Sequence, residues 1–354
     1  MRRASILFVL LLAAAIAAGA SHRWLALAWN AWHYPVAGPT DRTQIAISDQ
    51  RAYIAAGVDG IEVVDLATAR RVSLLSPPDR ADRIDDVAAA DGWLFALDAT
   101  APGYLLVYSL ANPDQPAFAG QSVAVPVGPF SGVSAAAGVV AVSGGTSQLT
   151  LREYDATGRL DNHVVTADFG RGQPDIALRP DGKLAAISTH SFGPNFSMTL
   201  AEVRRAPLRL KAVSQVVLPQ AGFTAGGYKP ARFPLVSAWQ GDRLYIAHGG
   251  GLSVIDATDP QQPRVLADDP QPRPAMDIAV TANTLDLVRA GAQPAILRYR
   301  LDRDAVPVLT ASLSLTSTND PGAIASAGPY TLITVRKQGW QLIVPTGFSA
   351  IPQP

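Results

Sequence analysis

Cysteine is absent from this 354-residue sequence. The chain therefore forms no disulfide bond, binds no metal through a thiolate, offers no thiol nucleophile and carries no lipid on an N-terminal cysteine. Contiguous catalytic motifs are absent too: there is no Gly-x-Ser-x-Gly, no His-Glu-x-x-His and no phosphate-binding glycine loop. Any site for chemistry has to be assembled from residues that are distant in the sequence.

Charge is sparse and balanced. Charged residues make up 16% of the chain, and the formal net charge is zero. No block of lysine and arginine occurs, and nucleic-acid binding depends on such clusters because they neutralise phosphates. The composition therefore excludes nucleic acid as an expected partner.

A repeated apolar pentad is the clearest feature that is present. Successive copies end at residues 65, 109, 155, 204, 256, 300 and 344, which gives steps of 44, 46, 49, 52, 44 and 44. A period in the forties with several strands per unit is typical of a β-propeller. The seven copies are Ile61–Asp65, Leu105–Ser109, Leu151–Asp155, Leu200–Arg204, Leu252–Asp256, Ile296–Arg300 and Trp340–Val344.

The interior of one repeat predicts four strands per unit. In the fifth unit, runs rich in β-branched and aromatic residues are separated by glycine, aspartate and proline. The runs are Arg232–Ala238, Arg243–His248, Leu252–Asp256 and Arg264–Ala267. No run after residue 40 keeps a helical period. We therefore predict an all-β fold, a single seven-bladed β-propeller of four-stranded blades over residues 42–345.

The seventh unit lacks a fourth strand, because residues 345–354 contain three prolines that cannot donate ladder hydrogen bonds. The apolar segment Trp24–Tyr34 precedes the first unit and has no unit of its own. Within residues 21–41 we therefore expect a closing strand that pairs as the outermost strand of the last blade. Residues 346–354 are expected to form a C-terminal tail.

The fifth unit resembles the LVIVD repeat of bacterial envelope propellers. The resemblance lies in Gly251–Pro263, preceded by Leu244–Ala247. Gly60–Asp65 is a second good copy, and the Asn112-Pro113 and Gln115-Pro116 pairs keep the proline spacing of a third. The resemblance implies a propeller in the cell envelope. It brings no agreed reaction and no catalytic motif.

The N-terminus has the pattern of an export signal. Arg2 and Arg3 precede the apolar run Ile6–Ala18, and Ala18-Gly19-Ala20 forms a small-residue processing site. We expect residues 1–20 to be a signal peptide, with the mature chain beginning near Ser21 in the periplasm or at the cell surface. The alternative is an uncleaved N-terminal membrane anchor, because an aromatic belt follows the run. Its members are Trp24, Trp29, Trp32 and Tyr34.

Polar residues recur at two positions of the repeat that share one mouth of a propeller channel. These positions are the loops leading into the innermost strands and the loops between second and third strands. A His, Asp and Arg constellation there could bind a metal or supply a general acid or base. The plainer interpretation is that the aspartates cap turns and the histidines are solvated. The residues are Asp85, Asp86, Asp175, Asp277, Asp98, His190, His248, Arg336 and Lys337.

Two long loops, Thr189–Ser197 and Pro219–Pro234, favour a binding site at the fourth and fifth blades, although they could also be tolerated insertions. Aromatic and basic side chains in these loops could line a pocket. They are Phe192, Phe196, Phe223, Tyr228, Lys229 and Arg232.

The functional hypothesis is a non-catalytic binding or scaffold module for a protein or small polar ligand of the envelope. The alternatives are a hydrolase, lactonase or lyase that acts on a small polar substrate at the mouth, and an interaction subunit of an envelope complex. We assign no catalytic residue and expect no cofactor, and the metal content is left open.

Overall fold

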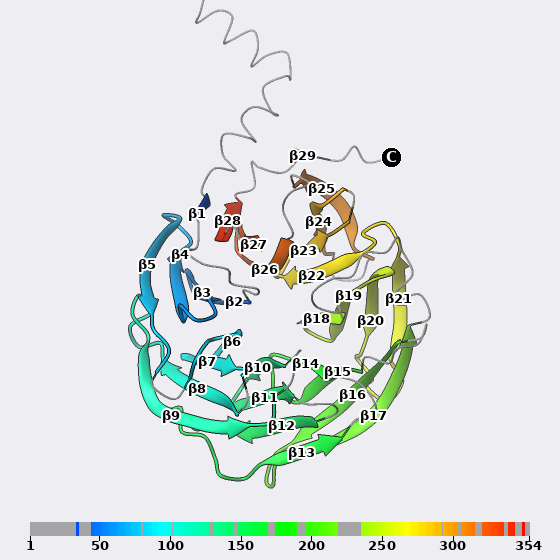
Figure 1. Cartoon of the computed structure of the whole chain (residues 1–354). Helices are drawn as coiled ribbons and strands as arrows, with labels where there is room; N and C mark the ends of the chain where they lie inside the picture. The colour runs from blue at the N-terminus through cyan, green and yellow to red at the C-terminus, as the bar shows by residue number, and fades with distance from the viewer. Residues whose placement is uncertain are drawn as a thin grey trace, which may run out of the picture.

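Seven antiparallel sheets stand around a ring (Figure 1). The computed structural model describes residues 33–34, 44–78, 81–100, 102–127, 131–144, 148–168, 174–189, 196–218, 235–291, 293–302, 306–315, 321–335, 339–343 and 349–350. Within these ranges no helix is long and apolar enough to cross a membrane. The expected signal peptide and its alternative, a membrane anchor, lie outside the described residues. The prediction of an all-β, seven-bladed propeller is confirmed.

Each blade is numbered here in chain order, and its strands run from the innermost outward. Blade 1 contains β2 (Ile45–Ser48), β3 (Arg51–Ala55), β4 (Ile61–Asp65) and β5 (Arg70–Leu75). Blade 2 contains β6 (Asp86–Ala90), β7 (Trp93–Asp98), β8 (Gly103–Ser109) and β9 (Ala117–Val125). Blade 3 contains β10 (Gly132–Ala136), β11 (Val139–Gly144), β12 (Gln148–Glu153) and β13 (Val165–Asp168). Blade 4 contains β14 (Pro174–Leu178), β15 (Leu184–Thr189), β16 (Phe196–Arg204) and β17 (Arg209–Leu218).

The remaining blades follow the same order. Blade 5 contains β18 (Leu235–Gln240), β19 (Arg243–His248), β20 (Gly251–Asp256) and β21 (Arg264–Asp269). Blade 6 contains β22 (Ala275–Val280), β23 (Thr284–Arg289), β24 (Ala295–Arg300) and β25 (Val308–Ser314), with β29 (Ser349–Ala350) as a fifth strand. Blade 7 contains β26 (Pro321–Ala327), β27 (Tyr330–Val335), β28 (Gly339–Ile343) and β1 (His33–Tyr34).

The core lies between blades rather than inside one sheet. Each joint between neighbouring blades holds a cluster of buried apolar side chains. In the joint between blades 1 and 2, for example, Tyr53 and Ile61 pack with Leu94. Because burying one large apolar side chain contributes about 1.5–3 kcal/mol, the sum over the seven joints stabilises the ring without cysteine.

A glycine at the start of the pentad has a steric reason. Gly251 has φ +137°, and a Cβ there would lie 2.0 Å from the carbonyl oxygen of Asp269 on the outer strand. Gly60 has φ +94°, and a Cβ would lie 1.9 Å from the carbonyl oxygen of Leu75. The third strand can therefore approach the fourth only where the side chain is missing.

Ring closure is achieved by the N-terminal segment. His33 pairs with Gln341 and Tyr34 with Trp340, so β1 is the outermost strand of blade 7, and the expected pairing holds for the described part of that segment. The indole N–H of Trp340 donates to Glu62 in blade 1, across the joint, at 3.1 Å. Burial raises the pKa of Glu62, while the hydrogen bond from Trp340 and the charge of Arg71 act in the opposite direction.

The C-terminal segment adds a strand to blade 6. Ser349 and Ala350 pair with Ser312 and Ala311 of β25, which makes blade 6 five-stranded. The tail expected over residues 346–354 therefore contains a strand.

The pentads of units 3 and 4 are shifted by two residues from their predicted positions. In blades 1, 2, 5 and 6 the first residue of the second strand pairs with the last residue of the predicted pentad, as Arg51 does with Asp65. By this register the third and fourth pentads end at Glu153, opposite Val139, and at Glu202, opposite Leu184. A shift of two keeps every side chain on its face of the sheet, so the hydrophobic pattern did not reveal it.

Candidate functional site

Most of the site predicted at the mouth of blades 4 and 5 lies outside the described residues. Asp175 lies in β14 and Phe196 begins β16, and nothing is described of their side chains. The site therefore stays a prediction. The residues outside the description are His190, Phe192, Phe223, Tyr228, Lys229, Arg232, Arg336 and Lys337.

Asp85 and Asp98 show that the two kinds of loop do meet at one end of a blade. In blade 2 the Asp98 carboxylate accepts the backbone N–H of Asp82, in the loop that leads into β6, at 3.0 Å. In return Asp85 accepts the N–H of Ala99, which follows β7, at 3.0 Å, and pairs with Arg83 at 2.7 Å. Both carboxylates are buried, and each accepts a backbone N–H of the other loop. Asp98 also accepts the N–H of Thr100, two residues on, at 2.8 Å, so it caps its own turn as well as linking the two loops.

Asp86 and Asp277 connect neighbouring blades. Oδ1 of Asp277 accepts the next N–H, of Ile278, and Oδ2 accepts the N–H of Ile324 in blade 7, both at 2.8 Å. Asp86 does the same at the joint of blades 2 and 3, where its Oδ2 accepts the N–H of Val133 at 2.9 Å. Each of these two aspartates thus links its own innermost strand to that of the next blade by hydrogen bonds, and we call such a link a staple.

His248 ends β19 and is fully buried, with 0% exposure. Its Nδ1 accepts the N–H of Gly250 at 3.1 Å, so the proton resides on Nε2, which donates to Ser253 Oγ at 2.8 Å. Ser253 in turn donates to Asp268 at 2.9 Å. Burial lowers the pKa of His248 to about 4, and the charge of Asp268 acts in the opposite direction.

The directions of these hydrogen bonds determine whether His248 could act as a general base. A hydrolytic relay needs a histidine with a free acceptor nitrogen next to the nucleophilic hydroxyl. Here the nitrogen that faces Ser253 carries the proton, and the other nitrogen is occupied by Gly250. The described residues also contain no group of three His, Cys, Asp or Glu side chains placed to hold a metal ion. In this arrangement His248 acts as a neutral link of blade 5.

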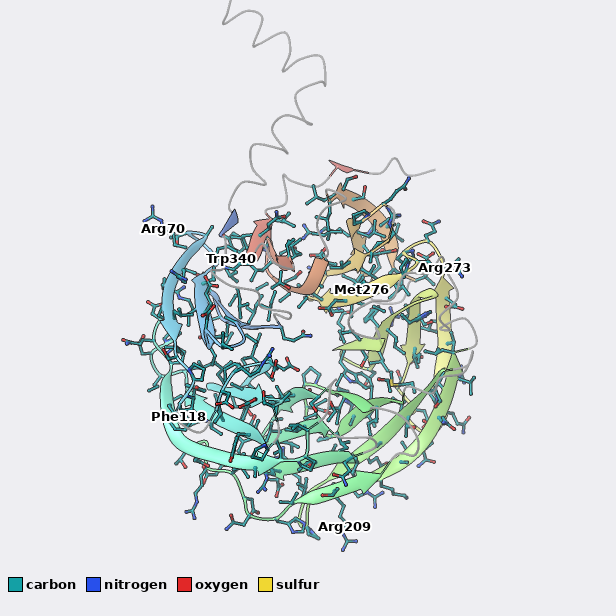
Figure 2. All side chains as sticks on the ribbon, in the orientation of Figure 1. Arg70, Phe118, Arg209, Arg273, Met276 and Trp340 are labelled. Carbon is teal, nitrogen blue, oxygen red and sulfur yellow. The ribbon has the colours of Figure 1, made fainter. Side chains whose placement is uncertain are left out.

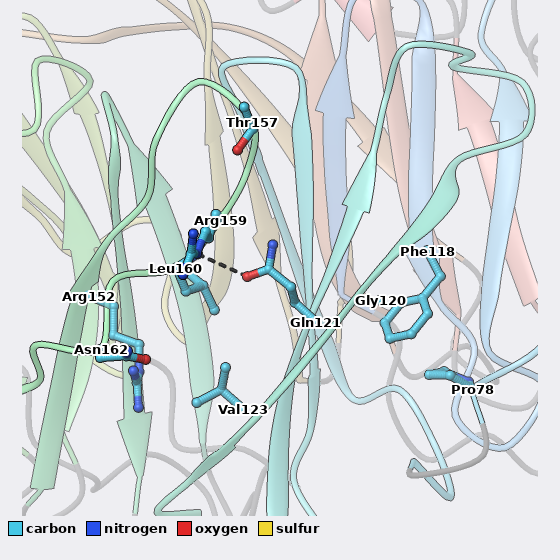
Figure 3. A pocket seen from close by; sticks show the side chains of 10 residues that line it. All are labelled: Pro78, Phe118, Gly120, Gln121, Val123, Arg152, Thr157, Arg159, Leu160 and Asn162. Atoms are coloured by element: carbon cyan, nitrogen blue, oxygen red, sulfur yellow. Dashed lines mark hydrogen bonds between the residues drawn. The ribbon is translucent and has the colours of Figure 1, made fainter.

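A large cavity lined in part by polar side chains lies instead on the outer perimeter, between blades 2 and 3. Its volume is about 1040 Å³. We call it the perimeter cavity; its lining consists of Pro78, Phe118, Gly120, Gln121, Val123, Arg152, Thr157, Arg159, Leu160 and Asn162 (Figure 3). Sequence reasoning did not select any of these residues.

A short outer strand creates the cavity. β13 has four residues and pairs with β12 only from Gln148 to Leu151. Beyond Leu151 the outer edge of β12 is met by the loop instead: the Glu153 carbonyl accepts the N–H of Asp161 at 2.9 Å, and the connection to β13 bulges outward. Across the gap β9 of blade 2 is nine residues long. The perimeter cavity lies between β9 and this loop.

The loop is held in place by blade 2. The side-chain amide of Gln121 accepts the N–H of Leu160 at 2.9 Å, the bond drawn in Figure 3, and donates to the carbonyl of Gly158 at 3.2 Å. Gly158 has φ +74°, and a Cβ there would lie 2.5 Å from the ring of Trp93. Asp155 Oδ1 accepts the N–H groups of Thr157 and Arg159. The wall is therefore ordered without a ligand.

Arg152 occupies a position that is apolar or tyrosine in every other blade. Arg152 lies opposite Val140, the second residue of β11, which is the second strand of blade 3. Its equivalents are therefore the residues that lie opposite the second residue of the second strand in the other blades. All six equivalents are buried and all six pack against the preceding blade. They are Val64, Tyr108, Ala201, Ile255, Tyr299 and Ile343.

This signal was present in the sequence but depended on the register. With the third pentad ending at Asp155, Arg152 occupies its second position, where Glu62 and Ser253 stand in other units. With the pentad ending at Glu153, Arg152 is the charged exception at a core position.

Comparison with known proteins identifies the fold. No family model matches the chain, and no curated protein matches it in sequence. A chain of Kuenenia stuttgartiensis hydrazine synthase is 12% identical, with a TM-score of 0.64 over 88% of this chain and 97% of that chain. A chain of a mitotic checkpoint complex is 11% identical, with a TM-score of 0.64 over 87% and 89% of the two chains. The β-propeller domain of Myceliophteria thermophila Cps50 (Swd1) is 10% identical, with a TM-score of 0.60 over 87% and 96%. At these identities the likeness shows the fold alone: the chain is a seven-bladed β-propeller.

Proposed function

We propose that the protein is an exported binding propeller of the bacterial cell envelope, of the LVIVD type, that holds a partner at its perimeter rather than transforming a substrate. The observation that carries this proposal is the perimeter cavity. It is about 1040 Å³ in volume and places an arginine where the other six blades have core residues. A charge at a core position of the joint does not serve the packing of that joint, and a binding role accounts for it.

Propeller structures in assemblies support the same class of function. One of the similar structures bears the name of a checkpoint complex, so this fold occurs in a multi-protein assembly. In this chain the well-described polar clusters, at Asp98, Asp277 and His248, bind their own or the neighbouring blade. The perimeter cavity differs because its polar groups face an open volume.

Export and the LVIVD assignment rest on the sequence. Arg2, Arg3 and the Ala18-Gly19-Ala20 site support a cleaved signal peptide. The best LVIVD copy forms β20 and the second copy forms β4, each opened by a positive-φ glycine. Mass measurement of protein recovered from its native envelope tests export. We expect a mature chain beginning near Ser21; an intact Met1 terminus in the membrane fraction would support the anchor instead.

Site-specific photo-crosslinking tests the binding function. A photoreactive residue is placed at Phe118, which is 40% exposed and lines the perimeter cavity. Matched positions are Val265, 49% exposed on β21, and His190 in the predicted mouth. We expect a discrete adduct in intact cells from position 118 and none from position 265.

An adduct from position 190 alone would move the binding surface to the mouth of blades 4 and 5. Equal labelling from positions 118 and 265, or no adduct from any position, would contradict a binding role for the perimeter.

A further inference from the structure

The perimeter cavity has a mainly polar wall from blade 3 and a mainly apolar wall from blades 1 and 2, with Leu160 and Gln121 as the exceptions. Arg152, Arg159 and Asn162 come from blade 3. Phe118 and Val123 come from β9 of blade 2, and Pro78 follows β5. Neither an aspartate nor a glutamate is among the ten lining residues. A ligand that satisfies both walls needs negative charge on one side and apolar surface on the other.

Arg152 is the anchor of the polar wall. It is half-buried, and its Nη1 donates to the carbonyl oxygen of Asp161 at 2.9 Å. Its Nε is buried and has no hydrogen-bond partner among the described residues. Burial lowers the pKa of Arg152, and the charge of Asp161 acts in the opposite direction without forming an ion pair, so the guanidinium is partly removed from water with its counter-charge at a distance.

The acidic groups nearest to the arginines are engaged elsewhere. The Asp161 carboxylate accepts the N–H of His163 at 3.1 Å, and among the described residues Arg152 feels its charge but hydrogen-bonds only to the Asp161 carbonyl. Asp155 is occupied by Thr157 and the backbone of Arg159. A second cavity of about 420 Å³, which shares Arg159, Leu160 and Asn162 with the first, does contain Glu153, Asp155 and Asp161. Arg152 lines the perimeter cavity and not this second one, and the lining of the perimeter cavity contains no carboxylate.

The arginines of the cavity suit a carboxylate. Guanidinium groups bind carboxylates through two parallel N–H donors, and an arginine held by a fixed wall loses little conformational freedom on binding. Gln121 and Asp155 hold that wall before any ligand arrives. Phe118 and Leu160 can then contact an apolar group attached to the carboxylate.

We infer that the perimeter cavity binds a ligand in which a carboxylate adjoins an apolar group, with Arg152 as the primary anion-binding residue and Arg159 as the secondary one. This inference rests on the proposed binding function and names its ligand class. Such a group occurs both at the C-terminus of a protein that ends in an apolar residue and in a free small acid.

Calorimetric titration of the full mature chain tests the inference. The probes are N-acetyl-leucine, its amide, the peptide acetyl-Gly-Ser-Gly-Leu with a free C-terminus, and inorganic phosphate. We expect both carboxylates to bind, the amide to bind at least about tenfold more weakly, and phosphate to bind no better than the amide. Peptide affinity at least tenfold above that of N-acetyl-leucine would identify a protein C-terminus as the source, and equal affinities a small acid.

Three arginine variants complete the test. Arg152→Gln should weaken N-acetyl-leucine binding by about tenfold or more, because it removes the charge-assisted hydrogen bonds to the carboxylate. Arg159→Gln, at an exposed position, should weaken it a few-fold and is expected to fold normally. The matched control is Arg264→Gln, which removes one exposed charge from β21 and should leave binding unchanged.

Equal binding of acid and amide, unchanged binding in both cavity variants, or no binding to the wild-type chain at millimolar concentration would overturn the assignment. Tighter binding of phosphate than of either carboxylate would also overturn it. The proposed binding function is tested separately by the crosslinking experiment. If a partner is crosslinked at position 118 but no carboxylate binds, the binding function stands and only this ligand class is wrong.

Discussion

Two half-buried arginines on third strands, Arg298 in blade 6 and Arg152 in blade 3, have opposite surroundings. Arg298 donates to both oxygens of Asp286, at 2.7 and 2.8 Å, and to Thr331 of blade 7 at 2.6 Å. The same carboxylate accepts from the hydroxyl of Ser326 at 2.8 Å. Arg152 has one carbonyl partner and a buried Nε without a partner among the described residues.

The difference separates a structural charge from a charge that is available to a ligand. At the joint of blades 6 and 7, carboxylate, guanidinium and two hydroxyls satisfy one another, so the cluster can only be disrupted by an added ligand. At the joint of blades 2 and 3, the arginine faces an open volume of about 1040 Å³. Figure 2 shows Phe118 on the side of the ring formed by the outer strands of blade 2, away from Arg273 and Met276 near blade 6. The cluster of blade 6 should therefore control stability, and Arg152 should control binding.

The largest expected effect comes from breaking the satisfied cluster. Asp286→Ala removes a carboxylate of 0% exposure and leaves Arg298 buried without its counter-charge. Removal of one partner of a buried ion pair typically costs about 3–5 kcal/mol. Chemical denaturation at pH 7 should show this loss in the free energy of unfolding.

Replacing the whole pair sharpens that result. Asp286→Leu combined with Arg298→Met removes both charges and keeps apolar volume, so it should recover most of the lost stability. If the double variant is as unstable as the single one, the cluster matters for its hydrogen bonds to Ser326 and Thr331 rather than for the charge pair.

Acid should destabilise the protein through His248. Its pKa is about 4 in the folded chain against an ordinary value of 6.5, so the unfolded chain binds the proton more tightly. The stabilising contribution is complete above pH 6.5 and is lost as the pH falls toward 4. A shift of this size corresponds to about 3 kcal/mol.

Denaturation curves between pH 7 and pH 4.5 measure this contribution. His248→Gln should flatten the pH dependence in that range, and His163→Gln, at an exposed position, should leave it as in the wild type. Identical slopes for all three proteins would contradict the neutral, buried state of His248.

A smaller effect is expected from the staples between innermost strands. Asp277→Ala removes the acceptor of two backbone N–H groups, one of them in the next blade. An unsatisfied buried donor costs about 1–3 kcal/mol, so we expect a loss of about 2 kcal/mol in the free energy of unfolding. Asp86→Ala should behave alike, because its bonds to Val87 and Val133 are equivalent. A loss below about 0.5 kcal/mol in both variants would show that water replaces the carboxylates.

The sequence was sufficient for the architecture because the fold repeats. Seven pentads and the missing fourth strand of the last unit predicted the blades and the pairing of the N-terminal segment with β28, which is now seen at His33 and Tyr34. The fifth strand of blade 6 was not predictable, because Ser349 and Ala350 lie in a proline-containing segment without an alternating pattern.

The candidate site was harder to predict for a physical reason. Propeller sites consist of residues from different blades, and alternation with period two cannot distinguish registers that differ by two residues. That ambiguity hid Arg152, whose exceptional character appears only when Val140 is known to be its partner. The aspartates at the innermost strands were recognisable as a set, but Asp86 and Asp277 staple blades, a role that requires knowledge of the neighbouring strand.

The smallest expected effect on stability completes the comparison of the two arginines. Arg152→Met keeps the apolar stem, removes a half-buried charge that has no carboxylate partner, and gives blade 3 an apolar side chain at the position where blade 5 has Ile255 and blade 7 has Ile343. The lost bond to the carbonyl of Asp161 is offset by relief of the desolvated charge, so the free energy of unfolding should change by less than about 1 kcal/mol, with either sign. Parallel denaturation of Arg152→Met and Arg298→Met measures the contrast. The second variant leaves Asp286 buried and unpaired and should lose about 3–5 kcal/mol. Equal losses in the two variants would mean that Arg152 stabilises the joint of blades 2 and 3, and the distinction between a structural and a ligand-binding arginine would then be wrong.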